Sequence, residues 1–235
     1  MRCIIKVMQT FPLAILPLPN IVLFPHTNIP MLISEPSYTK MIKDCIETDS
    51  NIGISLAEPI DELTGRIRYS PRSIGTMGRP ILLSENSDGS IKVLIRGEKR
   101  IELISAKQNI PHLIYKCRII PDQKESFKLG FDSPQITRLK SLLNKWVDDT
   151  ISDSLERETF FQSLSSIHHI TDYLAMFLVR DQSIRQILLE NISLHERIQI
   201  LSSLLRGDYP HCEDSIVVNA MKDYEQEEYD QFFIH

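Results

Sequence analysis

The side chains best suited to chemistry are His168 and His169, an adjacent pair of imidazoles. Imidazoles are common ligands of transition metals. Neighbouring residues on a helix, however, point about 100° apart and cannot both reach one ion. The acidic residue at helical spacing from the pair is Asp172. The pattern therefore favours helix capping or a surface position for both histidines over a metal centre.

Paired carboxylates, the residue type of general acid–base catalysis, occur at Asp148-Asp149 and at Glu156 and Glu158. Both pairs lie in polar stretches of helical period, which is typical of solvated helix faces. The cysteines stand at least 42 positions apart and have neither metal-ligand nor redox spacing. They are Cys3, Cys45, Cys117 and Cys212. This spacing is typical of thiols in a reducing cytosol.

Motifs of nucleotide-dependent and hydrolytic enzymes do not occur: the sequence has no G-x-x-x-x-G-K-[ST], no G-x-S-x-G and no H-E-x-x-H. Gly75-Thr76-Met77-Gly78 lacks the lysine of a phosphate loop and lies in a strand pattern, which indicates a bulge or a close approach of two backbones. The sequence thus predicts a protein that is not an enzyme and that has no catalytic residues, metal or cofactor. A hydrolase assembled from distant residues is the weaker alternative.

The net charge of −5 is unevenly distributed along the chain. Residues 208–235 carry −7, and residues 1–207 carry +2. The compact basic group is Arg96, Lys99 and Arg100, which we expect to guard an exposed strand edge. A nearly neutral body without a basic block does not favour nucleic-acid binding.

The first 121 residues have the pattern of short strands around one helix. The helix is expected from Pro36 to Glu47, and the polar segment Glu58–Pro71 is expected to be a loop. Asn86-Ser87-Asp88-Gly89 predicts a hairpin turn, because Asp-Gly readily supplies a positive φ. The expected strands are Leu13–Leu18, Asn28–Ser34, Asn51–Ala57, Ser73–Ser84, Ser90–Ile95, Lys99–Ile104 and Leu113–Ile120. Together they predict a partly closed barrel over residues 1–121.

After Pro121 the period of the apolar residues becomes helical, so the fold class expected for the whole chain is α+β. We expect a linker over 122–131, a helical bundle over 132–207 and an acidic, disordered tail over 208–235. The first helix begins near Pro134 and has an apolar stripe of Ile136, Leu139, Leu143, Trp146 and Val147. Further helices are expected over Asp153–Ser165, Asp172–Val179 and Ser183–Glu190. The last helix has a capping box, Ser193 with Glu196, buries Leu194, Ile198, Leu201 and Leu205, and stops at Gly207.

The apolar segment Phe11–Pro25 is interrupted by four prolines, so it does not predict a membrane-spanning helix. The sequence that follows it has no signal-peptide cleavage pattern. We therefore expect a soluble, cytoplasmic protein.

Four blocks in the barrel half resemble, in order, the N-terminal, substrate-binding domain of Lon proteases. Phe11–Pro25 (FPLAILPLPNIVLFP) is similar to the opening of that domain, and Glu35–Cys45 is similar to its helix. Ile74–Gly78 and Lys92–Ile101 resemble its strands. Blocks in the helical half also match, so the resemblance covers roughly residues 11–206. Those blocks are Asp172–Ala175, Arg185–Glu190, Glu196–Ile198 and Leu204-Leu205.

The resemblance implies a PUA-like pseudo-barrel followed by a helical bundle, which can hold a polypeptide but not cut it. Full-length Lon continues into an ATPase and a serine–lysine peptidase, so a stand-alone member without these two domains is expected. Two residues depart from the family pattern. His26 stands where the family often has glycine. Ser37 replaces the usual arginine, so no contact through that arginine is carried over.

The function that follows from the resemblance is non-catalytic binding of unfolded or exposed apolar protein segments. An imperfectly closed barrel would offer an edge for strand addition, and the cleft between barrel and bundle would offer an apolar groove. The expected lining is Phe24, Pro25, Met31, Tyr38 and Met77, because methionine and aromatic side chains adapt to varied apolar segments. Phe24 and Met31 can instead simply fill the barrel core.

Two other functions stay open at this point. The first is a PUA-like RNA-binding module, which the charge of residues 1–207 disfavours. The second is a regulatory adaptor whose acidic tail, with Tyr224, Tyr229 and Phe232-Phe233, docks a protein partner. A solubilising tail is the simpler interpretation of the same residues.

Overall fold

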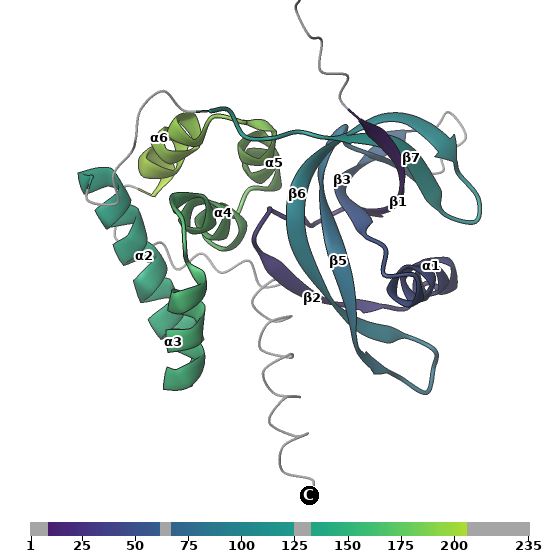
Figure 1. The fold of residues 1–235 in the computed structure, drawn as a ribbon, viewed down its shortest axis with the longest axis horizontal. Helices are drawn as coiled ribbons and strands as arrows, with labels where there is room; N and C mark the ends of the chain where they lie inside the picture. Colours follow the sequence, from purple (N-terminus) through teal and green to yellow (C-terminus); the bar gives the residue numbers. More distant parts are fainter. Residues whose placement is uncertain (1–8, 62–66, 125–132, 206–235) are drawn as a thin grey trace, which may run out of the picture.

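The computed structural model describes residues 9–61, 67–124 and 133–205. The strands and the first helix form one lobe, and the five later helices form a second lobe beside it (Figure 1). The expected α+β class, with a β-rich half followed by a helical half, is confirmed. Gly207, the acidic tail and most of the expected linker lie outside the described residues.

The barrel closes on itself through backbone pairing. A path of neighbouring strands runs β1–β7–β6–β5–β3, and a parallel pairing of β1 with β3 joins its two ends. The expectation of a partly closed barrel is therefore wrong for this ring. β2 pairs with β6 and β4 pairs with β3, outside the ring. The strands are β1 (Thr10–Leu18), β2 (Asn28–Ile33), β3 (Ile52–Asp61), β4 (Ile67–Pro71), β5 (Ile74–Glu85), β6 (Ile91–Gln108) and β7 (Leu113–Ile119).

Two expectations about the strands are wrong. The segment Glu58–Pro71 is not all loop, because the end of β3 and the whole of β4 pair in antiparallel register from Ala57↔Pro71 to Asp61↔Ile67. Tertiary pairing there overrides a polar, proline-containing sequence. The segments 90–95 and 99–104 belong to one continuous strand, β6. The pairing with β5 shifts register at Gly78, opposite Gly97, so the strand continues through an irregularity instead of ending.

Neighbouring backbone segments of the barrel approach each other closely at Gly75 and Gly78, and these approaches explain why glycine stands at both positions. A Cβ at Gly75 would lie 2.4 Å from the carbonyl oxygen of Ile54, and one at Gly78 would lie 2.6 Å from that of Arg96. The expected bulge and close backbone approach at residues 75–78 are both confirmed. The predicted hairpin turn between β5 and β6 is also confirmed, with Gly89 at a φ of 84°.

Helix α1 (Pro36–Glu47) packs against β5 (Figure 1). Its N-terminus is capped by the carboxylate of Glu35, which accepts a hydrogen bond from the backbone N–H of Tyr38. Met41 and Ile42 are buried on its inner face, as the apolar period predicts. An ion pair between Lys43 and Glu85 connects the helix to the end of β5.

In the helical lobe, α4 is the central element. It contacts α2, α5 and α6, and its sequence is apolar on nearly every side because it is surrounded. The predicted stripe of α2 is buried at all five positions. Within the described ranges, no helix is long and apolar enough to cross a membrane. The helices are α2 (Pro134–Thr150), α3 (Ser154–Ser163), α4 (Ile167–Phe177), α5 (Gln182–Glu190) and α6 (Leu194–Leu204).

The cap of α6 matches only half of the predicted capping box. The hydroxyl of Ser193 accepts from the backbone N–H of Glu196, as expected. The backbone N–H of Ser193 donates to Asn191 instead of to the Glu196 carboxylate, and that carboxylate accepts from the Asn191 amide. A neighbouring side chain has therefore replaced the reciprocal bond.

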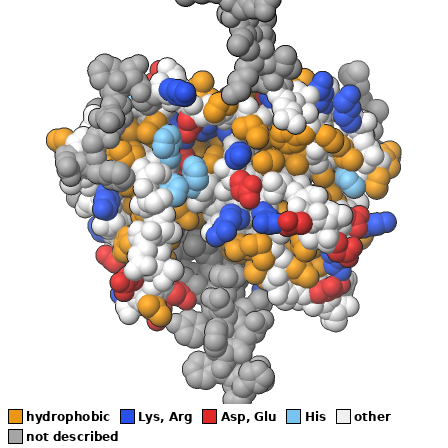
Figure 2. Space-filling model, viewed as in Figure 1, with side chains coloured by type: hydrophobic (Ala, Val, Ile, Leu, Met, Phe, Trp, Pro, Cys, Tyr) orange, Lys and Arg blue, Asp and Glu red, His pale blue; other side chains and the backbone are white. Residues whose placement is uncertain are grey.

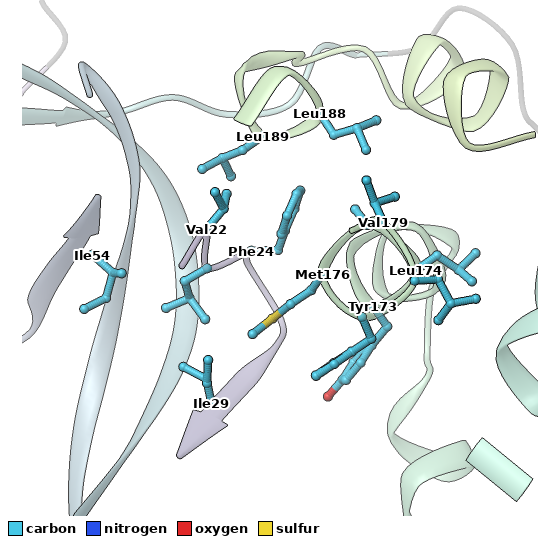
Figure 3. Close-up of a cluster of buried hydrophobic side chains, with 14 of the residues drawn as sticks. Val22, Phe24, Ile29, Ile54, Tyr173, Leu174, Met176, Val179, Leu188 and Leu189 are labelled. Atoms are coloured by element: carbon cyan, nitrogen blue, oxygen red, sulfur yellow. The ribbon is translucent and has the colours of Figure 1, made fainter. Parts of the chain in front are cut away.

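The two lobes share one hydrophobic core. Val22, Phe24 and Ile29 from the barrel side face Met176 and Val179 from the helical side (Figure 3). The apolar cleft expected between barrel and bundle is therefore filled by packed side chains. A second, smaller cluster of Leu13, Ile15, Met77, Ile101, Leu103 and Cys117 lies within the β lobe.

Candidate functional site

The five residues expected to line a polypeptide-binding surface do not share one accessible face. Phe24 is fully buried, Pro25 is buried, and Met31 and Met77 are 9% and 8% exposed. Phe24 and Met31 belong to the shared core, whereas Met77 belongs to the smaller cluster. Tyr38 is half-buried, and burial followed by the nearby Glu35 charge raises the pKa of its phenol. Their role in binding stays a prediction, and Tyr38 is the member with an accessible side chain.

The junction between the lobes contains a buried ionic network that the sequence patterns did not reveal. The Asp172 carboxylate of α4, 1% exposed, lies 2.7 Å from Nη1 of Arg197 on α6. Its other oxygen lies 3.0 Å from Nδ1 of His26, in the segment between β1 and β2. Asp172 thus connects the barrel to the bundle through one carboxylate.

His26 has a backbone conformation that glycine would favour. Its φ is 65°, in the left-handed region, where a residue other than glycine costs about 1–3 kcal/mol. The backbone N–H of His26 donates to Gly97 at 2.9 Å, and its ring packs on that of His169 at a centroid distance of 4.5 Å. His26 therefore adopts a backbone conformation suited to glycine and adds side-chain contacts with the helical lobe.

Asp122, at the start of the expected linker, is the second centre of the same network. It pairs with Arg197 at 2.9 Å, with His168 at 2.9 Å and with Arg100. Burial alone would raise the pKa of Asp122, but the His168 hydrogen bond and the charges of Arg197 and Arg100 outweigh it and hold that pKa well below its usual range. The start of the linker is therefore fixed to both lobes.

The histidine pair lies in the first turn of α4, because this helix begins five residues before the start expected at Asp172. Pale blue histidine side chains gather between the two lobes in Figure 2. His168 bonds to Asp122, and Nδ1 of His169 lies 2.9 Å from the carbonyl oxygen of Ser163. Within residues 9–61, 67–124 and 133–205, no group of three His, Cys, Asp or Glu side chains is arranged to hold a metal ion. In this structure, His168 connects α4 to Asp122, and His169 connects α4 to the end of α3.

The expectation for the basic group is wrong at one of its three residues. Arg96 and Lys99 are exposed, but Arg100 is 3% exposed and pairs with Asp122 instead of guarding a strand edge. Its Nε donates to the carbonyl oxygen of Leu189 in the helical lobe. These three nearby basic residues look alike in sequence, and the contact of Arg100 with Leu189 and Asp122 distinguishes it from the other two.

Ser37, Cys45 and Cys117 do not have the surroundings of activated nucleophiles. Ser37 and Lys40 fit the spacing S-x-x-K, but the Ser37 hydroxyl donates to the Glu35 carboxylate that caps α1. Burial raises the pKa of the Cys117 thiol to about 11. Burial, followed by the Asp44 charge, also raises the pKa of Cys45. Both thiols are free, and neither environment favours a thiolate.

An accessible apolar surface lies on the outer face of β2, β6 and β5. In antiparallel register, Pro30 of β2 is opposite Leu94 of β6, which is opposite Ile81 of β5. Leu32 follows two residues along β2 and is 58% exposed, while Ile81 is 39% exposed. This face, named the β2–β6–β5 face below, belongs to the front of the barrel lobe, where hydrophobic, basic and acidic side chains mix in Figure 2. No sequence pattern marked it, because its members come from three strands.

A closed barrel joined through a shared core to a helical bundle defines the class of the chain. Residues 12–207 match the family model described as the ATP-dependent protease La (LON) substrate-binding domain, so the chain belongs to that family. The Lon protease of Parabacteroides distasonis is 25% identical over 229 residues, which cover 97% of this chain and 28% of that protein. Lon protease 2 of Myxococcus xanthus is 22% identical over 193 residues, which are 82% of this chain and 23% of that protein. The chain spans about a quarter of the length of these relatives.

Solved structures show the same fold. A Lon N-terminal domain protein from Xanthomonas campestris superposes with a TM-score of 0.59 at 21% identity, covering 82% of this chain and 98% of that chain. The N-terminal domain of Mycobacterium avium complex Lon protease also has a TM-score of 0.59, at 15% identity, with 97% of that chain covered. The family resemblance seen in the sequence blocks is therefore confirmed over nearly the whole described chain.

Proposed function

We propose that this chain is a non-catalytic module that binds extended, apolar polypeptide segments on the β2–β6–β5 face. The observation that carries the proposal is the row Pro30–Leu94–Ile81 with Leu32 beside it, an apolar strip crossing three strands on the outside of the barrel. Exposed apolar patches on soluble proteins mark sites where another molecule docks. The family description, a substrate-binding domain of an ATP-dependent protease, supports a protein substrate.

The barrel beneath the strip is well packed, which suits a binding surface. Ile29, Met31 and Ile33 of β2 point inward between the exposed positions and belong to the shared core. Pro30 cannot donate a backbone hydrogen bond, so addition of a strand along β2 would be incomplete at that residue. Side-chain contact with the strip is therefore the main source of affinity in this proposal. Of the five residues expected from the sequence, Tyr38 stays as a further contact candidate.

The test is a titration of a fluorescently labelled, permanently unfolded protein against the chain, followed by anisotropy. The double variant Leu32→Ser/Ile81→Ser should weaken binding about tenfold, because two half-exposed aliphatic side chains together contribute roughly 1.5 kcal/mol on burial. Leu155→Ser is the matched control, since Leu155 is 70% exposed on α3, away from the strip. Equal affinities for the wild type and the double variant would refute the location of the site.

RNA offers a second arm of the same experiment. We expect single-stranded RNA not to compete with the labelled polypeptide at physiological salt, in keeping with the near-neutral charge of residues 1–207. Competition that disappears steeply with salt would favour the RNA-binding alternative. The cytoplasmic location expected from the cysteine pattern stays a prediction.

A further inference from the structure

Two arginines lie directly opposite each other at one end of the apolar strip. Arg79 of β5 and Arg96 of β6 are cross-strand partners, two residues along their strands from Ile81 and Leu94. Both are exposed. Like charges directly opposite each other on neighbouring strands destabilise a sheet, so such a pair is best tolerated where an anion neutralises it.

Only one of the two arginines has a carboxylate partner in the described part of the chain. Arg79 pairs with Asp49, at the end of α1. The interaction shown for the Arg96 guanidinium is with the phenol of Tyr173 on α4, where burial raises the phenol pKa and the Arg96 charge lowers it. Among residues 9–61, 67–124 and 133–205, Arg96 forms no ion pair with Asp or Glu. Within those ranges, no carboxylate neutralises its charge.

The spacing of these groups matches an extended peptide. Residues two apart on a strand point to the same side and lie about 6.8 Å from each other. From Arg96 to Leu94, and from Arg79 to Ile81, the face changes from cationic to aliphatic over that distance. A peptide lying along the strands can place an acidic side chain against Arg96 and, two residues further on, an apolar side chain against Leu94.

We propose that the β2–β6–β5 face selects extended polypeptide segments in which an acidic and an apolar side chain stand two residues apart, with Arg96 as the group that receives the carboxylate. This inference rests on the proposed function and adds the chemistry of the substrate. The chemistry of the face favours a peptide over RNA, because the strip residues Pro30, Leu32, Leu94 and Ile81 are aliphatic, and unpaired bases bind by stacking on aromatic side chains.

The test uses the full chain and three labelled, unstructured peptides of equal length. One repeats Asp-Ser-Leu-Ser, one repeats Asn-Ser-Leu-Ser, and one repeats Lys-Ser-Leu-Ser, so that the variable residue and Leu stand two positions apart on the same side of the extended chain. We expect the wild type to bind the Asp peptide about two- to fivefold more tightly than the Asn peptide at low salt, as one exposed charge-assisted contact allows. The Lys peptide should bind most weakly.

The variant Arg96→Gln should abolish the preference for the Asp peptide and leave the affinity for the Asn peptide within about twofold of the wild type. Lys107→Gln is the matched control, because it removes one exposed positive charge from the same strand, β6, away from the strip. Its preference should equal that of the wild type. Equal losses in the two variants would show general electrostatic attraction and overturn the role of Arg96.

The outcomes separate the two proposals. If the Asp and Asn peptides bind equally to the wild type, and Leu32→Ser/Ile81→Ser weakens both, the polypeptide site stands and the selection by Arg96 is wrong. If no peptide binds at tens of micromolar, the proposed function fails and this inference fails with it. If Arg96→Gln weakens binding of single-stranded RNA more than binding of the Asp peptide, the face is a nucleic-acid site instead.

Discussion

Replacing Asp172 with asparagine removes a negative charge from the centre of the junction while keeping the shape of the side chain. In the native protein the Asp172 and Arg197 side chains are each 2% exposed, and Nη1 and Oδ1 are 2.7 Å apart. Asparagine keeps one acceptor oxygen, which can still accept from Arg197, and places an N–H donor where the second oxygen faces His26. The substitution therefore removes the charge and the acceptor for His26 while keeping the volume of the side chain.

The expected loss in the free energy of unfolding depends on the ionic partner that Arg197 keeps, which is Asp122. Breaking a buried pair so that one charge has no partner costs about 3–5 kcal/mol. Arg197 retains Asp122, which lies 2.9 Å away and is 24% exposed, so part of its charge stays compensated. We expect the free energy of unfolding to fall by about 2–3 kcal/mol. For a chain of this size, that corresponds to roughly 5–10 °C in Tm.

The measurement is urea unfolding at neutral pH, followed by circular dichroism. Asp181→Asn is the matched control, because Asp181 caps α5 by accepting from the backbone N–H of Ile184 and asparagine caps a helix equally well. The control should change the free energy of unfolding by less than about 0.5 kcal/mol. If Asp172→Asn costs no more than this control, the ionic network does not hold the two lobes together.

A double-mutant cycle of His26→Ala with Asp172→Asn then measures the contact across the junction. Residues in direct contact couple by about 0.5–3 kcal/mol, whereas independent sites add within about 0.5 kcal/mol. The Nδ1–Oδ2 distance of 3.0 Å predicts coupling. Additive losses would mean that His26 contributes nothing through Asp172.

Three further predictions concern stability. The pKa of Asp122 is lower in the native state than the ordinary carboxyl value near 3.9, so its contribution to the free energy of unfolding is complete above about pH 5 and is lost as the pH falls through 4 toward 2. In Asp122→Asn, the loss of stability over this pH range should be smaller by that contribution. An unchanged dependence of stability on pH would contradict the ionic role of Asp122. Gly97→Ala should lower the free energy of unfolding by at least about 2 kcal/mol, because its Cβ would lie 2.2 Å from the carbonyl oxygen of Phe24. Gly89→Ala, in open space but at a φ of 84°, should lower it by about 1 kcal/mol. Equal losses in urea unfolding would argue against the close approach at Gly97. Trp146→Ala should lower the free energy of unfolding by about 3–5 kcal/mol, since the residue is 1% exposed. Leu155→Ala, at an exposed position, should show almost no change in the same calorimetric measurement. A loss below about 1 kcal/mol for Trp146→Ala would contradict the place of Trp146 in the core.

The local elements could be predicted from consecutive residues. The stripe of α2 is buried as expected, the cap at Ser193 forms, and Asp88-Gly89 turns the chain between β5 and β6. These features depend on contacts within four residues, and the helical or two-residue period records those contacts directly in the sequence. The family could also be identified, because its blocks are short local segments in a constant order.

The candidate sites, in contrast, depend on partners far apart in the chain. His26 and Asp172 are 146 residues apart, and Asp122 and Arg197 are 75 residues apart. The apolar strip joins Pro30, Leu94 and Ile81 through the registers of two strand pairings. A shift of one residue in either register would turn the paired side chains to the opposite face, so no local pattern could locate the strip. Short-range periodicity therefore specifies the helices and turns of this protein, while the pairing of distant strands and helices determines which charges are buried and which apolar side chains remain accessible.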